Sequence, residues 1–104
     1  LGGEAVTKRE REWIDRIVQL GCIICRLKYY AYVPAEVHHM LNGGRRIGNL
    51  STLPLCVLHH RGGRNDDEVV SRDHSQRRFE ARYGSESMLL ERTRELIGWE
   101  STAT

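Results

Sequence analysis

Seven side chains of the kinds that bind metal ions occur along this chain in three groups: Cys22 and Cys25, then His38 and His39, then Cys56, His59 and His60. A tetrahedral zinc site takes four ligands, and C-x-x-C and C-x-x-H spacings are typical of such sites. The expected ligands of a structural zinc are Cys22, Cys25, Cys56 and His59. Three histidines are left over, and a metal-dependent hydrolase uses groups of this kind. The surplus favours an enzyme.

The remaining histidines are predicted to meet around a second ion. His60 directly follows His59 on one short helix, so its side chain points about 100° away and is expected to face a β-hairpin that carries His38 and His39. Two histidines from different elements can hold one divalent ion and leave positions open for water and phosphate oxygens. A third histidine that stays off the metal has an ordinary pKa near about 6.5 and can take a proton from water.

A helix is predicted ahead of the first cysteine pair and loop structure after it. Thr7 and Glu10 have the capping-box spacing, and a helix over about 8–20 follows and ends before Gly21. Its apolar stripe comprises Trp13, Ile14, Ile17, Val18 and Leu20. Residues 22–25 are expected to form a tight turn, and residues 28–33 with their three tyrosines a strand or loop.

A β-hairpin, a short helix and two last helices are predicted in the remaining sequence. Strands are predicted at 36–40 and 49–53, with Pro54 ending the second, a Gly-rich turn at 42–44 between them, and Asn49 opposite the histidine pair. Residues 55–60 suit a first helical turn, and two helices are expected within about 75–98. Their expected buried residues are Phe79, Tyr83, Leu89, Leu90, Leu96 and Ile97. The prediction is one α+β domain over 1–104, with its core at about 21–63.

Size and cysteine content narrow the class of protein. A chain of 104 residues with 39% hydrophobic content has a thin core, which a structural metal would help to stabilise. Three cysteines cannot all form disulfides, so their spacing favours zinc thiolates in a reducing cytoplasm. A thiol redox role for Cys22 and Cys25 is a poorer interpretation because it leaves every histidine unexplained. Without a run of roughly 20 apolar residues or a leader pattern, a cytoplasmic protein with no membrane segment is predicted.

The net charge is small, but the charged residues are unevenly distributed along the chain. The net charge is only +2, yet no acidic residue lies between Glu36 and Asp66. Four arginines fall in that interval and are the expected nucleic-acid contacts: Arg45, Arg46, Arg61 and Arg64. Guanidinium groups suit bidentate contacts to phosphate, so a positive field is expected around the site, although a solvated arginine-rich surface is the simpler reading for any one of them.

The order C-x-x-C, H-H, N, C-x-x-H-H resembles the HNH, or ββα-metal, endonuclease superfamily. Residues 22–60 are most similar to the phage recombination-enhancement nucleases (Ref and its relatives), which share the H-H pair, a following Gly-Arg turn and an L-P-L-C-x-x-H-H segment, here residues 53–60. The resemblance implies a small zinc-stapled ββα-metal domain with flanking helices. By position it makes His39 the general base and Asn49 the residue that orients it, and it makes His38 and His60 ligands of the catalytic metal.

The resemblance also implies the reaction and the partners. A metal-dependent DNA endonuclease of phage origin would use one metal ion and a histidine base to leave a 5′-phosphate and a 3′-hydroxyl. The expected cofactors are a structural Zn²⁺ and a catalytic Mg²⁺, Mn²⁺, Ni²⁺ or Zn²⁺. The expected partners are DNA and either a recombinase filament or another phage or host DNA-processing protein. The alternative is a non-catalytic zinc-knuckle module that binds nucleic acid. His74 lacks an established ligand spacing and is expected at the surface.

Overall fold

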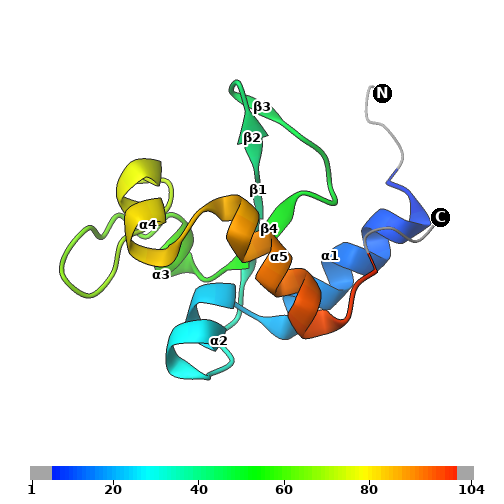
Figure 1. Cartoon of the computed structure of the whole chain (residues 1–104), viewed down its shortest axis with the longest axis horizontal. Helices are drawn as coiled ribbons and strands as arrows, with labels where there is room; N and C mark the ends of the chain where they lie inside the picture. Colours follow the sequence, from blue (N-terminus) through cyan, green and yellow to red (C-terminus); the bar gives the residue numbers. More distant parts are fainter. Residues whose placement is uncertain (1–5, 101–104) are drawn as a thin grey trace.

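Five helices and four short strands make up residues 6–100, the part of the chain that this computed structural model describes (Figure 1). They are α1 (Lys8–Leu20), α2 (Ile23–Tyr29), β1 (Glu36–His39), β2 (Leu41–Asn42), β3 (Arg45–Arg46), β4 (Thr52–Leu55), α3 (Val57–His60), α4 (Gln76–Tyr83) and α5 (Glu86–Ile97). The arrangement is a small α+β domain, as predicted. Residues 1–5 and 101–104 of the range predicted as one domain lie outside the described part.

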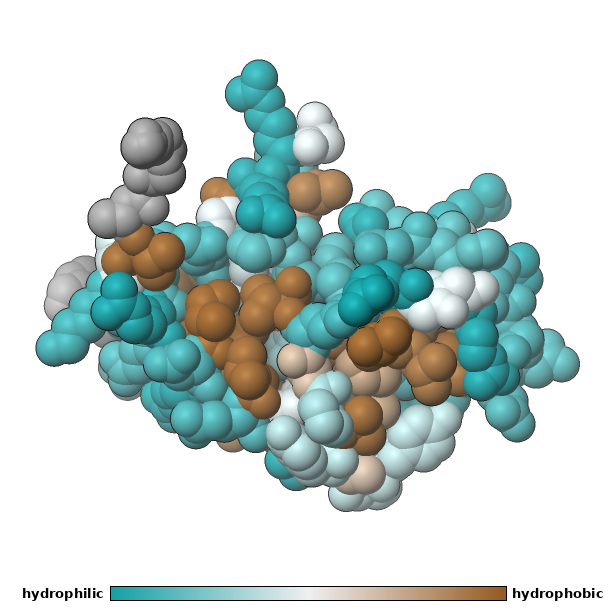
Figure 2. Space-filling view, turned by 180° about the vertical axis from the view of Figure 1, so that it is seen from behind, coloured by the Kyte–Doolittle hydropathy of each residue, from teal (hydrophilic) through white to brown (hydrophobic). Residues whose placement is uncertain are grey.

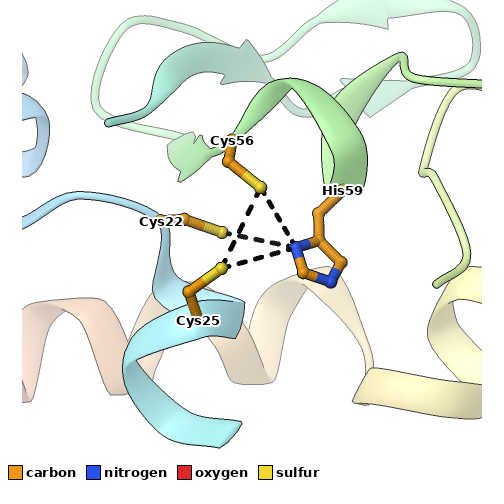
Figure 3. Close-up of side chains that lie close together, drawn as sticks. All are labelled: Cys22, Cys25, Cys56 and His59. Atoms are coloured by element: carbon orange, nitrogen blue, oxygen red, sulfur yellow. Dashed lines mark hydrogen bonds between the residues drawn. The ribbon is translucent and has the colours of Figure 1, made fainter. Parts of the chain in front are cut away.

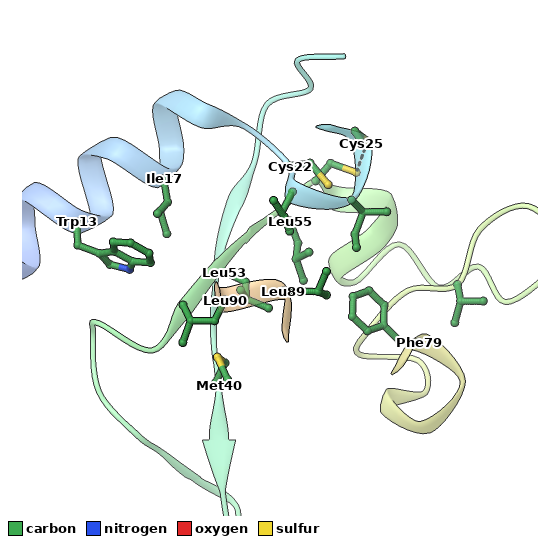
Figure 4. Packing of buried hydrophobic residues seen from close by; sticks show 14 residues of the cluster. Trp13, Ile17, Cys22, Cys25, Met40, Leu53, Leu55, Phe79, Leu89 and Leu90 are labelled. Atoms are coloured by element: carbon green, nitrogen blue, oxygen red, sulfur yellow. Dashed lines mark hydrogen bonds between the residues drawn. The ribbon is translucent and has the colours of Figure 1, made fainter. Parts of the chain in front are cut away.

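An antiparallel pair of strands, β1 and β4, lies at the centre, with Glu36 opposite Leu55 and His39 opposite Thr52. Every residue of β4 is buried, and α1, α2 and α5 pack against this strand. Figure 4 shows Leu53 and Leu55 among side chains from these helices. One polar contact crosses the core, where Trp13 Nε1 donates a hydrogen bond of 2.8 Å to Thr52 Oγ1.

The second strand of the hairpin lies later than predicted. It spans Thr52–Leu55 and includes Pro54, so Asn49 lies in the turn before the strand and not opposite the histidines. Proline fits here because β4 has β1 as its one partner in the sheet, and a proline without an N–H is tolerated at a free strand edge. The prediction that Pro54 ends the strand was wrong for this reason.

A second, smaller hairpin, β2–β3, extends outward beyond β1. Its turn residues Gly43 and Gly44 have φ angles of 62° and 81°, which residues other than glycine rarely adopt. All residues from Leu41 to Ile47 are exposed, and Figures 1 and 2 show this arm projecting from the body of the molecule. The arm carries Arg45 and Arg46 away from the core.

The first cysteine pair is fixed between two helices. Thr7 and Glu10 form the predicted capping box, and Gly21 ends α1 with φ 84°. A Cβ at position 21 would lie 2.8 Å from both Tyr32 Cδ1 and Val33 O, so only glycine fits. Residues 23–29 are helical, which corrects the prediction of a tight turn at 22–25 and of strand or loop at 28–29, whereas residues 30–33 form the loop that was predicted. Arg26, Leu27 and Lys28 are good helix formers, and this local preference outweighed the tyrosines.

The last two helices begin at serine caps: Ser75 accepts from the amide of Arg78, and Ser85 from that of Met88. Phe79 and Leu89 are fully buried, but Leu96 is 47% exposed, contrary to the prediction. Val18 on α1 is likewise exposed. Within residues 6–100, no helix has the length and apolar character needed to span a membrane.

Two candidate metal centres

The first candidate centre is the predicted cysteine group. Cys22 is the N-cap of α2, Cys25 lies in that helix, Cys56 is the N-cap of α3, and His59 lies within α3. The three sulfurs lie 3.7, 3.7 and 3.2 Å from Nδ1 of His59, and Cys25 Sγ is 4.0 Å from Cys56 Sγ (Figure 3). All four residues are buried and form a group that can hold one metal ion.

The dimensions of this group fit a tetrahedral ion. Zinc–sulfur bonds of about 2.3 Å and a zinc–nitrogen bond of about 2.0 Å require sulfur–sulfur edges of about 3.8 Å and sulfur–nitrogen edges of about 3.5 Å. The observed sulfur–nitrogen distances of 3.2 to 3.7 Å bracket the required value of about 3.5 Å, and the sulfur–sulfur distance of 4.0 Å between Cys25 and Cys56 is close to the required value of about 3.8 Å. Nδ1 of His59 faces the sulfurs, while its buried Nε2 has no partner among the described residues. The ring is held instead by edge-on packing against Tyr83, with centroids 5.2 Å apart.

Electrostatics also favour a cation among the three sulfurs. A hydrogen bond between Cys22 and Cys56 lowers the pKa of the Cys56 thiol, and the same bond together with burial raises the pKa of Cys22. Burial and the neighbouring Cys56 charge raise the pKa of Cys25 to about 11. The protein alone therefore favours one thiolate, whereas a divalent ion would stabilise all three.

The second candidate centre joins His38 on β1, His60 on α3 and Asp73 in the segment before α4. The two imidazole rings lie edge-on with centroids 5.1 Å apart, and Asp73 Oδ2 is 3.8 Å from His60 Nε2. One ligand atom from each residue lies within 4.8 Å of the others, close enough to hold one ion. His38 is buried but Asp73 is exposed, so this centre is open on one side.

Sequence reasoning missed Asp73, which reaches the centre through the backbone. The amides of Arg72 and Asp73 donate hydrogen bonds of 2.8 Å to the carbonyls of His59 and His60 at the end of α3. No sequence motif predicts that the chain returns to the end of α3 at Asp73. The one available signal was the general preference of a divalent ion for a carboxylate beside two histidines. The adjacent His74 is exposed and outside the group, as expected of a surface residue.

Two further carboxylates lie behind the histidines. Glu36 Oε1 is 2.8 Å from His60 Nδ1, and Glu86 Oε1 is 3.2 Å from His38 Nε2. Hydrogen bonds from Arg61 and His60 lower the pKa of Glu36 to about 2. Burial raises the pKa of Glu86, but hydrogen bonds from His38 and Arg72 outweigh it and leave the pKa lowered.

The expectation of a positive field around the histidines assumed that no carboxylate lies near them, and that assumption was wrong. Glu36 lies at the boundary of the interval without acidic residues, and Asp73 and Glu86 lie beyond its end. The fold brings all three carboxylates to His38 and His60. An interval free of acidic residues in the sequence is thus not a region free of them in space.

His39 is the last residue of β1 and has different neighbours from His38. Its Nε2 lies 3.2 Å from Asn49 Oδ1, which joins the predicted base to the predicted orienting residue. Both side chains line a cleft of about 410 Å³ along α1, bordered by Arg11, Ile14 and other residues. The structure thus brings His39 and Asn49 together, and His39 is not part of the metal-binding group.

The four predicted nucleic-acid arginines fall into two pairs. Arg61 forms an ion pair of 2.6 Å with Glu36, and Arg64 one of the same length with Asp66. Arg45 and Arg46 have no ion-pair partner within residues 6–100 and are exposed on β3. Arg46 also lines a cleft of about 480 Å³ that includes His39 and Asn49. Figure 2 shows a predominantly hydrophilic surface on the projecting arm.

Fold and site together define a small α+β domain with two groups of side chains that can each hold a metal ion, one sealed and one open. The chain belongs to the family described as recombination enhancement, RecA-dependent nucleases, whose family model matches residues 6–98. This confirms the resemblance to the recombination-enhancement nucleases and indicates an enzyme that acts on nucleic acid. No curated protein matches the chain significantly.

Proposed function

We propose that this protein is a metal-dependent DNA endonuclease of the HNH type, acting as one domain with β1, β4 and α3 as its ββα-metal core. The observation that carries the proposal is that two adjacent histidines at the end of β1 have different partners. His38 joins the open metal-binding group, and the next residue, His39, is hydrogen-bonded to Asn49. The family match supports nuclease activity, and this geometry supports a particular way of achieving it.

Two ions are proposed. The sealed group of three cysteines and His59 would hold a structural Zn²⁺, because its dimensions and thiolates suit that ion. His38, His60 and Asp73 would hold the catalytic ion. Two imidazole nitrogens and a carboxylate oxygen suit Mn²⁺, Ni²⁺ or Zn²⁺, and Mg²⁺ when water supplies the remaining ligands.

In the proposed reaction, His39 acts as the base. When its Nε2–H donates to Asn49 Oδ1, the lone pair on Nδ1 is free to take a proton from water. The water oxygen attacks phosphorus and the bond from phosphorus to the 3′ oxygen breaks, which leaves a 5′-phosphate. The 3′ oxygen departs with the electron pair of that bond and takes a proton from a second water molecule, which gives the 3′-hydroxyl. A divalent ion bound at the open centre would offset the negative charge that develops on the departing oxygen.

The substrate is proposed to reach His39 along the arm. Arg45 and Arg46 are free to contact phosphates, and Arg46 lines a cleft that contains His39 and Asn49. The family description names RecA, so we propose DNA held by a recombinase filament as the substrate and a phage origin for the enzyme. Arg61 and Arg64 would contribute less because Glu36 and Asp66 already engage them.

A cleavage assay tests the proposal. Circular single-stranded DNA and plasmid are incubated with Mg²⁺, Mn²⁺ or Ni²⁺, with and without a RecA filament. The parent protein should cut at least one of these substrates, and His39→Ala should cut it about 100-fold to 10,000-fold more slowly, because general base catalysis is lost. His74→Ala is the matched control, since it removes an exposed histidine outside both centres.

Equal cutting by the parent and His39→Ala would remove His39 from the assigned role. DNA binding by the parent without cutting under any condition would favour the non-catalytic zinc-knuckle module instead.

A further inference from the structure

Each imidazole of the open centre has a carboxylate on its outer side. His60 Nδ1 meets Glu36 Oε1 at 2.8 Å, and His38 Nε2 meets Glu86 Oε1 at 3.2 Å. Glu36 comes from the same strand as His38, but Glu86 is 48 residues from its histidine and begins α5. The second contact therefore joins the open centre to a helix that the HNH resemblance does not cover.

The carboxylate of Glu86 is buried, and both of its oxygens have polar partners. Its exposed fraction is 4%, and its second oxygen, Oε2, accepts a hydrogen bond of 2.7 Å from Arg72 Nε. Arg72 Nη1 lies 3.5 Å from Asp73 Oδ1. His38, Glu86, Arg72, Asp73 and His60 thus form a continuous chain of charged and polar contacts that begins and ends at the open centre.

An ordinary buried ion pair is the simpler reading of Glu86 and Arg72. Removing two charges from water is costly, and apolar residues of similar volume often stabilise a fold as well or better. The helix is already anchored by the buried side chains of Leu89 and Leu90. Stability alone therefore does not account for a carboxylate that divides its two oxygens between His38 and Arg72.

We propose, on the basis of the proposed function, that Glu86 is a positioning residue that orients His38 for the catalytic metal, and that Arg72 fixes Glu86 and Asp73 in one arrangement. Acceptance of the Nε2–H of His38 by Glu86 leaves Nδ1 of the ring to bind the ion. A carboxylate in this place fixes the tautomer and the ring orientation and makes the imidazole a stronger ligand. The C-terminal helix would thereby belong to the metal site.

Metal affinity provides a measurement independent of cleavage. Protein purified with zinc in the cysteine group is titrated with Mn²⁺, and free Mn²⁺ is followed by electron paramagnetic resonance. Loss of the outer carboxylate is expected to weaken Mn²⁺ binding about 10-fold to 100-fold in Glu86→Gln, and further in Glu86→Ala. Glu91→Gln is the matched control, because it removes the same charge from an exposed position on the same helix.

A double-mutant cycle separates positioning from direct ligation. If Glu86 acts through His38, Glu86→Gln should have no further effect in a His38→Ala background. An undiminished effect there would overturn the proposal, and so would unchanged affinity in a folded Glu86→Ala variant. Should circular dichroism show that Glu86→Ala does not fold, the isosteric Glu86→Gln decides. Binding by the parent with unaffected variants overturns this inference alone, whereas no Mn²⁺ binding by the parent overturns the proposed catalytic centre with it.

Discussion

The sealed and the open centre take adjacent residues from one four-residue helix. His59 turns toward three buried sulfurs, and His60 turns toward His38 and Asp73. His59 has no hydrogen-bond partner for its outer nitrogen among residues 6–100, whereas His38 and His60 each meet a carboxylate there. Burial and outer partners, together with the ligand types, distinguish the sealed centre from the open one.

The largest expected effect is loss of the fold when the sealed centre is broken. Cys22→Ser removes a fully buried ligand, and structural zinc in small domains contributes about 10–16 kcal/mol of apparent binding free energy that folding depends on. We expect this variant to be unfolded at room temperature. Circular dichroism melts with and without a zinc chelator measure it, and a parent protein insensitive to the chelator would contradict the role of the sealed centre.

Loss of activity without loss of fold is expected at the open centre. His60→Ala should lower the cleavage rate at least about 100-fold and also weaken Mn²⁺ binding strongly, because a ligand is gone. His39→Ala should lower the rate similarly but keep Mn²⁺ binding, because His39 is outside the metal-binding group. Paired Mn²⁺ titrations and cleavage assays distinguish ligand from base. Loss of Mn²⁺ binding in both variants would erase the distinction between them.

A smaller effect is expected from the surface arginines. Arg45→Ala or Arg46→Ala should weaken DNA binding several-fold and lower the slope of log affinity against log salt by about 1, the loss of one phosphate contact. Arg64→Ala should change both less, because Arg64 is paired with Asp66. Fluorescence anisotropy at several salt concentrations provides the measurement. Equal losses at positions 45 and 64 would show that ion pairing does not separate the two kinds of arginine.

The smallest expected effect is on the melting temperature at acid pH, through Asp66 in the loop that precedes Asp73. Hydrogen bonds from the Val69 amide, Arg64 and the Glu68 amide lower the pKa of Asp66 to about 2 from its ordinary 3.8. A carboxylate whose pKa is lowered by folding stabilises the folded state at pH values above its ordinary pKa. This contribution disappears as the pH falls toward 2. Asp66→Asn should therefore melt slightly below the parent at pH 7 and level with it near pH 2. A constant difference at both pH values would exclude this titration.

Local signals in the sequence predicted the local features well. The capping box at Thr7, the two helices within 75–98 and the short helix at 57–60 depend on neighbouring residues, and all are present. The cysteine group could also be predicted, because its spacing is itself a geometric constraint.

Long-range placement could not be predicted in the same way. Asp73 and Glu86 reach the histidines through backbone hydrogen bonds and helix packing that no motif encodes. The exposure of Leu96 likewise depends on which face of α5 meets β4. The helical state of residues 23–29 was missed for a local reason, because helix and strand preferences compete within that segment.

The brevity of α3 has a consequence for how related chains can differ in length. One inserted or deleted residue between Cys56 and His60 would misplace both rings at once, so that segment tolerates no change in residue number. The mostly exposed stretch from Gly62 to Glu68 bears no ligand of either centre and can change length at a smaller cost, provided that its end still returns to the carbonyls of α3. Gaps between homologous sequences should therefore gather after His60 and avoid the four residues before it.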